Sequence, residues 1–251
     1  MTLKSACKTA IVLISVSFTL LVFGQVFRVL MMFCQKTASH NGWTATPPTQ
    51  HLSLFFMWML HSFWYLLYPA LLIAGFITLL SGCLKKQDDP QANVKTRYIV
   101  AAVLTGLATL VMAWRSVGFA WITLRHSPHF DFRFGLILCV QLIAFLCAIS
   151  LCAFAAINTR KSPVRTPAVL AVVCHWLLAL LMVISIGNAL FSMTMIMDSP
   201  QHLGRLFPVF WLAYSIASYT GNFLRLAAVL IFLTVWLQQL GTTKQQLRNG
   251  N

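Results

Sequence analysis

The sequence predicts an all-α membrane protein: one polytopic domain over residues 1–251, built as a six-transmembrane-helix bundle. The first observation is composition, because 59% of the residues are hydrophobic and only 9% are charged, whereas a soluble chain has about a quarter of its residues charged. The second is six long apolar runs, each exceeding the roughly 20 residues that a helix needs to cross about 30 Å of hydrocarbon. These runs show no strict polar/apolar alternation, so helices are favoured over a barrel.

The expected spans are 9–33, 53–82, 98–124, 134–157, 167–197 and 207–237. The first follows Lys4 and Lys8 as a signal sequence would, but it is too long for one and no small-x-small cleavage site follows it. We therefore expect a retained helix. Pro90 marks the connection after the second span, and Pro163 marks the one after the fourth. No connection is long enough to form a soluble domain.

The basic residues are distributed unevenly between the two sides that six spans define. The side of the termini carries Lys4, Lys8, Lys85, Lys86, Lys95, Arg97, Arg160, Lys161, Arg165, Lys244 and Arg248. The other side carries Lys36, Arg125, Arg133 and Arg205. Because cytoplasmic loops carry the excess of Lys and Arg, this predicts an integral protein of a bacterial inner membrane with both termini in the cytoplasm. Basic residues scattered between apolar runs also indicate a lipid bilayer rather than nucleic acid as the partner, despite the net charge of +14.

A short pattern recurs before three of the spans and suggests three tandem helix hairpins. A His is followed five residues later by a Phe at His51, His129 and His202. Fourteen residues before the last two lie Arg115 and Asn188, at equal depth in the third and fifth spans. Arg28 becomes their counterpart if the first loop carries an insertion. Matches this short also arise by chance in a chain with 19 Phe, so the repeat stays one of two interpretations.

Three arginines, Arg28, Arg115 and Arg225, fall inside the expected spans. Placing an Arg at the centre of a membrane helix costs about 2.5 to 3.5 kcal/mol even on lenient scales. Arg28 is near enough to the outer end of its span to extend to the headgroups, whereas the other two are deeper. All four acidic residues lie in or beside loops: Asp88, Asp89, Asp131 and Asp198. The deeper arginines are therefore expected to face the bundle interior and to contact carbonyls, polar side chains, water or a bound anion.

A polar stripe accompanies one of these arginines on the sixth span. Ser215, Ser218, Asn222 and Arg225 are spaced by three, four and three residues, so they share one helix face. A stripe that ends in an unpaired cation is consistent with a hydrated cavity for an anionic or strongly dipolar ligand, and a second interpretation carries equal weight. The alternative is a seam of small polar residues between helices, with the arginine capping carbonyls.

A second hypothesis is a metal-binding or haem-binding membrane subunit that uses His51, His129 and His202 on the outer face. Imidazoles and the Met-rich end of the fifth span suit Cu(I), although Met also fills gaps in any apolar bundle. Haem requires two axial His at one depth on facing helices. His61 and His175, the two inside spans, lie toward opposite membrane faces.

The chain contains no C-x-x-C, G-x-S-x-G, P-loop or dinucleotide motif, which disfavours an enzyme. The leading prediction is a small polytopic inner-membrane protein that binds or passes an anionic or polar solute without a prosthetic group. Its expected site residues are Arg115, Asn188, Asn222 and Arg225, with Arg28 at the outer mouth. A third hypothesis is a structural or assembly subunit of a larger membrane complex, whose arginines pair with acids of a partner protein.

Overall fold

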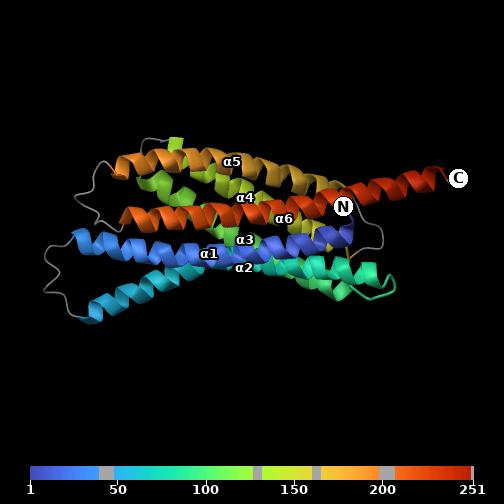
Figure 1. The fold of residues 1–251 in the computed structure, drawn as a ribbon, viewed down its shortest axis with the longest axis horizontal. Coiled ribbons are helices and arrows are strands. Elements are labelled where there is room, and N and C mark those ends of the chain that lie inside the picture. Colours follow the sequence, from blue (N-terminus) through green and yellow to red (C-terminus); the bar gives the residue numbers. More distant parts are fainter. Residues whose placement is uncertain (40–47, 127–131, 160–164, 198–206, 250–251) are drawn as a thin grey trace.

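The computed structural model describes residues 1–39, 48–126, 132–159, 165–197 and 207–249. The helices of these segments are α1 (Leu3–Ser39), α2 (Pro48–Asp88), α3 (Lys95–His126), α4 (Phe132–Ile157), α5 (Thr166–Met197) and α6 (Phe207–Asn249). They run side by side along the long axis, with both termini at one end (Figure 1). We call that end the terminal side and the opposite end the distal side. The predicted six-helix bundle is confirmed.

Each helix contains a stretch long and apolar enough to cross a membrane, so the protein is an integral, multi-pass membrane protein. The helices extend beyond the expected spans, most clearly at the end of α6, which continues to Asn249. An apolar run marks only the part that suits hydrocarbon. Helical hydrogen bonding continues through the polar residues beyond it, and for this reason hydropathy underestimates helix length.

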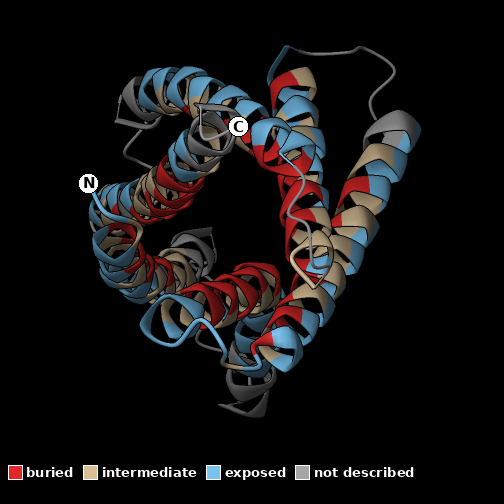
Figure 2. Ribbon diagram, turned by 90° about the vertical axis from the view of Figure 1, so that its right-hand side faces the viewer, coloured by how far each residue is buried: buried red, intermediate tan, exposed pale blue. Residues whose placement is uncertain are grey.

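The six helices form a ring in chain order. Each helix packs against the next, and α6 closes the ring against α1 through the most extensive interface of all. Viewed along the bundle, the buried residues lie on the inner faces of the ring (Figure 2). The pairs α1–α2 and α5–α6 share smaller interfaces than this closing pair, and the interpretation of the sequence as three tandem hairpins stays a prediction.

Small residues allow the helices to approach closely at two places. Where α1 meets α6, Ser17 Oγ donates a 2.5 Å hydrogen bond to the carbonyl of Gly221, and a Cβ on that glycine would lie 3.0 Å from the Ser17 carbonyl oxygen. Where α2 meets α3, a Cβ on Gly75 would lie 2.7 Å from Thr105 Cγ2. An added Cβ would force a neighbouring group to move at Gly75 and would be tightly fitted at Gly221, so both glycines favour close approach of the helices.

The axis of the terminal half is filled by an aromatic plug consisting of Phe76, Phe154, Phe232 and Trp236. The rings of Phe76 and Phe154 meet that of Phe232 edge-on, with centroids 5.7 and 6.0 Å away. Trp236 contacts Phe154 at 4.8 Å, also edge-on. Because these side chains come from α2, α4 and α6, which alternate around the ring, they close the centre of the bundle.

The distal half of α2 behaves differently from the other helices. Pro69 lies within the helix, where it has no N–H to donate and its ring crowds the preceding turn, which bends helices. Beyond it, the distal part of α2 diverges from α1 (Figure 1). Large apolar side chains such as Phe56, Leu60 and Phe63 are exposed there. The bundle is consequently more open on the distal side.

Candidate functional site

A central cavity of about 360 Å³ lies on the distal side of the aromatic plug. Every helix contributes to its lining, from Leu21 on α1 to Arg225 on α6. Each helix also supplies at least one polar side chain: Gln25, Tyr65, Arg115, Gln141, Ser185 and Arg225 are one from each. Polar side chains from all six helices thus meet in a partly open cavity whose lining is otherwise apolar.

The polar stripe predicted on α6 lies largely in this cavity. Ser218, Asn222 and Arg225 line it, while Ser215 does not and Tyr214 takes its place near the distal end. Residues four and then three apart follow one side of a helix. Ser218 also lies against α1, since a Cβ on Gly24 would be 2.9 Å from Ser218 Oγ. The stripe therefore serves both as cavity wall and as seam between helices.

Arg225 occupies the deep end of the cavity and is only 7% exposed. Its guanidinium carbon is 5.8 Å from the ring centre of Tyr68, which is also buried. The Tyr68 hydroxyl is 3.5 Å from the carbonyl of Ala144, a long contact that holds the ring only weakly. The aromatic face provides electrostatic attraction for the cation without neutralising its charge.

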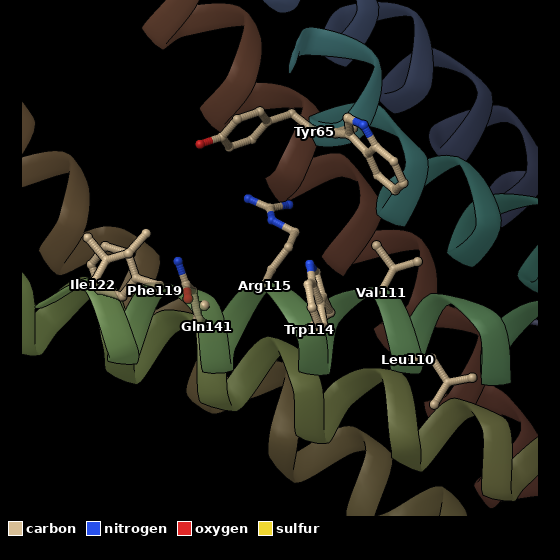
Figure 3. Close-up of a pocket in the computed structure, with 10 residues that line it drawn as sticks. Tyr65, Leu110, Val111, Trp114, Arg115, Phe119, Ile122 and Gln141 are labelled. Atoms are coloured by element: carbon tan, nitrogen blue, oxygen red, sulfur yellow. The ribbon is translucent and has the colours of Figure 1, made fainter. Parts of the chain in front are cut away.

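Arg115 and Arg28 meet at a single aromatic ring. The guanidinium carbon of Arg28 is 3.9 Å from the ring centre of Tyr65, and that of Arg115 is 4.6 Å from the same centre. The Arg115 side chain extends from α3 toward Tyr65, with Gln141 on the neighbouring helix (Figure 3). Two cations therefore lie near one another at this ring, and their mutual repulsion would be reduced by an anion bound beside them.

No carboxylate compensates this charge in the part of the chain that the structure describes. The one ion pair there joins Lys4 to Asp88 at 2.7 Å, on the terminal side. No acidic side chain appears in the cavity lining. Arg115 and Arg225 hence give the cavity a positive charge in surroundings of low dielectric constant, where attraction for an anion is strong.

Three buried polar atoms have no hydrogen-bond partner among the described residues: Gln25 Oε1, Gln141 Oε1 and Ser218 Oγ. All three residues line the central cavity. Buried polar groups in folded proteins nearly always find a partner in protein or water. Their gathering around one cavity marks it as the place where hydrogen bonding among the described residues is least complete.

The remaining expected site residues lie outside the cavity lining. Arg28 is half-buried, about one helical turn toward the distal side from Gln25, and does not line the cavity. Asn188 is half-buried on α5, and its carbonyl accepts a 3.0 Å hydrogen bond from Ser192. The structure thus brings Arg28 and Arg115 together at Tyr65 but does not add Asn188 to them.

The histidines of the metal hypothesis fall where the structure gives no side-chain description. His129 and His202 lie outside the described residues, as do the side chains of His51 and His61. Within the described residues, no three His, Cys, Asp or Glu side chains gather as metal ligands would. His175 is buried, with Nδ1 2.6 Å from the Ala171 carbonyl oxygen.

Sequence reasoning missed two amides and a tyrosine that build the site: Gln25, Gln141 and Tyr65. The two glutamines could have been found in the sequence, because an amide within an apolar span needs a hydrogen-bond partner just as a charged group does, although burying an amide costs less free energy. Tyr65 carried no comparable signal, since a tyrosine in a span is ordinary. Only the packing of α2 against α1 and α3 brings its ring under both arginines.

No family model matches the chain, and no curated protein or solved structure matches it either. The chemistry of the cavity is clear from its own residues. It is a positively charged chamber with unsatisfied polar atoms, closed toward the terminal side by aromatic rings.

Proposed function

We propose that this protein binds or passes a small anionic or polar solute in the central cavity. The observation that supports this most directly is the presence of Arg115 and Arg225, from helices on different sides of the ring, in a cavity lined by no acid. A guanidinium presents several donors in a planar fork that suits carboxylate and phosphate. Asn222, one turn from Arg225, adds an amide that can donate or accept.

The cavity volume of about 360 Å³ fits a small solute, since small-molecule pockets typically span about 300 to 1,000 Å³. Arg28 would attract the anion, and Arg115 and Arg225 would hold it. In this conformation the aromatic plug blocks the terminal side, so the solute would enter through the distal half of the bundle. Passage would require Phe76 and Phe232 to separate, as expected for alternating access around a central site.

The charge distribution of the loops favours a bacterial inner membrane with cytoplasmic termini, so that the cavity would open to the outer side. Reporter fusions after Asn93 and after Thr159 should then read cytoplasmic, while a fusion after Thr46 should read external. A reversed result at any two of these positions would contradict the orientation. A reversed orientation would leave the geometry of the cavity unchanged and would alter only the side of the membrane from which the solute enters.

Anion binding is tested by the thermal unfolding midpoint of the protein in phosphatidylcholine nanodiscs, titrated with acetate, inorganic phosphate or sulfate at constant ionic strength. We expect at least one of these anions to raise the midpoint, because a ligand that binds only the folded state at 100 times its Kd stabilises by about 2.7 kcal/mol. Arg225→Leu should fold and lose this response. Arg225→Lys should keep part of it if charge alone matters, and little if the planar fork is required.

Arg165→Leu is the matched control, because it removes an exposed arginine outside the cavity lining and should leave the anion response unchanged. A wild-type protein that responds to none of the three anions would contradict the proposal. So would an Arg225→Leu variant that fails to fold when the Lys variant folds without any anion response. That second result would make Arg225 a structural cap and would favour an assembly subunit.

A further inference from the structure

A second hollow adjoins the central cavity between α2 and α3. This lateral groove has a volume of about 720 Å³ and an apolar wall that includes Leu110, Val111, Trp114 and Ile122. Trp114 is 80% exposed, so in a membrane the outer edge of the groove faces hydrocarbon. The groove is therefore open to acyl chains rather than to water.

The lateral groove and the central cavity share three residues: Tyr65, Arg115 and Gln141 line both. The shared residues are among the most polar in the groove, and the close-up shows the Arg115 side chain directed toward Tyr65 rather than toward the apolar wall (Figure 3). A molecule lying in the groove would thus meet the cation at its inner end. Its apolar part would remain in contact with Leu110 and Trp114.

The polar junction has two features that call for an anionic group. Arg28 and Arg115 both lie over the Tyr65 ring, without a carboxylate partner among the described residues. Gln141 Oε1 is buried there and lacks a partner. A phosphate or carboxylate can accept from the guanidinium, and the amide can rotate to donate to it.

The depth of the junction distinguishes this site from ordinary lipid contact. Arg115 is ten residues from Arg125, the next charged residue along α3, so about 15 Å of helix separates it from that end of the apolar run. Bulk lipids keep their headgroups at the surface. An anionic group at Arg115 would therefore belong to a molecule that the protein has drawn inward.

We infer that the solute of the central cavity is an anionic amphiphile that enters sideways from the bilayer, with its phosphate or carboxylate at Arg115 and its acyl chain in the lateral groove. This inference rests on the proposed anion binding in the cavity and adds the chemical class and the route. The bent distal half of α2 forms one wall of the groove, through Trp64 and Tyr65. The opening between α2 and α3 is thus the entrance.

The test compares two carboxylates with the same head, acetate and octanoate, in the nanodisc unfolding assay. The two carboxylates are compared at their free aqueous concentrations, which excludes the octanoate that has partitioned into lipid. Octanoate should raise the midpoint of the wild-type protein at a free concentration at least roughly tenfold lower than acetate, because its chain leaves water for the apolar groove. Gly118 lines the groove but not the central cavity, and a Cβ there would meet nothing within 4 Å. Gly118→Trp should fill the groove and remove the advantage of octanoate while leaving the response to acetate.

Gly187→Trp is the matched control, because Gly187 on α5 is equally open and lines neither hollow. It should behave as wild type. Equal potency of the two carboxylates, or equal effects of the two Trp variants, would overturn the amphiphile inference and leave the proposed anion binding intact. Absence of any response to acetate, phosphate, sulfate and octanoate would overturn both.

The source of the amphiphile is identified by doping the nanodiscs with phosphatidylglycerol or with oleate. Stabilisation by phosphatidylglycerol alone indicates a membrane lipid, and stabilisation by oleate alone indicates a free fatty acid. Arg115→Leu should abolish either effect, whereas Arg165→Leu should not. If neither dopant stabilises the wild-type protein, the site does not take amphiphiles and the inference fails.

Discussion

The terminal and distal halves of the bundle are made by the same six helices but packed in different ways. In the terminal half, aromatic rings from α2, α4 and α6 meet on the axis, and α2 approaches α3 closely at Gly75 and Thr105. In the distal half, the axis is a cavity with Arg115 and Arg225 in its wall, and a groove separates α2 from α3. The terminal half is a packed core, whereas the distal half surrounds a cavity and a groove.

The α2–α3 pair shows most clearly what this difference teaches. A Cβ at Gly75 would lie 2.7 Å from a neighbouring side chain, whereas a Cβ at Gly118 would meet nothing within 4 Å. The bend at Pro69 lies between the level of close contact and the level of the groove. One proline thus permits a closed terminal half and an open distal half in a single helix.

The largest stability effect is expected in the aromatic plug. Phe232 is fully buried, so Phe232→Ala should reduce the free energy of unfolding by about 3 to 5 kcal/mol through lost contacts and a new void. Ser218→Ala, in the cavity wall, should change it by less than about 0.5 kcal/mol. Unfolding in mixed micelles measures both. Similar losses in the two variants would mean that the halves are packed alike.

A smaller effect is expected from adding one methyl group at one glycine of α2 and at one glycine of α3. Gly75→Ala should destabilise by about 1 to 3 kcal/mol, because the contact with Thr105 is already tight. Gly118→Ala should stabilise by roughly 0.5 to 1 kcal/mol, since alanine is the better helix former and space is available. The two variants should therefore shift the unfolding midpoint in opposite directions. Midpoint shifts of the same sign in the two variants would contradict the difference between close packing at Gly75 and open space at Gly118.

A small effect is also expected at Gln141, whose Oε1 is buried without a partner among the described residues. Gln141→Leu should leave the free energy of unfolding within about 1 kcal/mol of wild type, because replacing an unsatisfied polar group by an apolar one is nearly neutral or stabilising. Anion binding should weaken in the same variant. A loss of stability above that range would show that Gln141 makes a structural hydrogen bond.

The site was only partly predictable from the sequence. The stripe Ser218, Asn222 and Arg225 follows from helical periodicity alone, and it lies on the cavity as one face. Arg115 and Asn188 were grouped because they occupy equivalent positions in a short repeat, yet only Arg115 lines the cavity. Equal depth along two helices does not fix which way each side chain faces, because rotation of a helix about its axis is set by its neighbours.

The sequence by itself determined that the chain crosses a membrane as six helices. Apolar length and the need to pair every backbone polar group within a segment are local properties, and they leave no other solution. Only the tertiary structure decided that α6 closes a ring against α1, that one end is filled by aromatic rings, and that Arg28 and Arg115 share the ring of Tyr65. In lipid, hydrophobicity does not distinguish one helix face from another, so these choices depend on the close fit of small residues such as Ser17, Gly75 and Gly221.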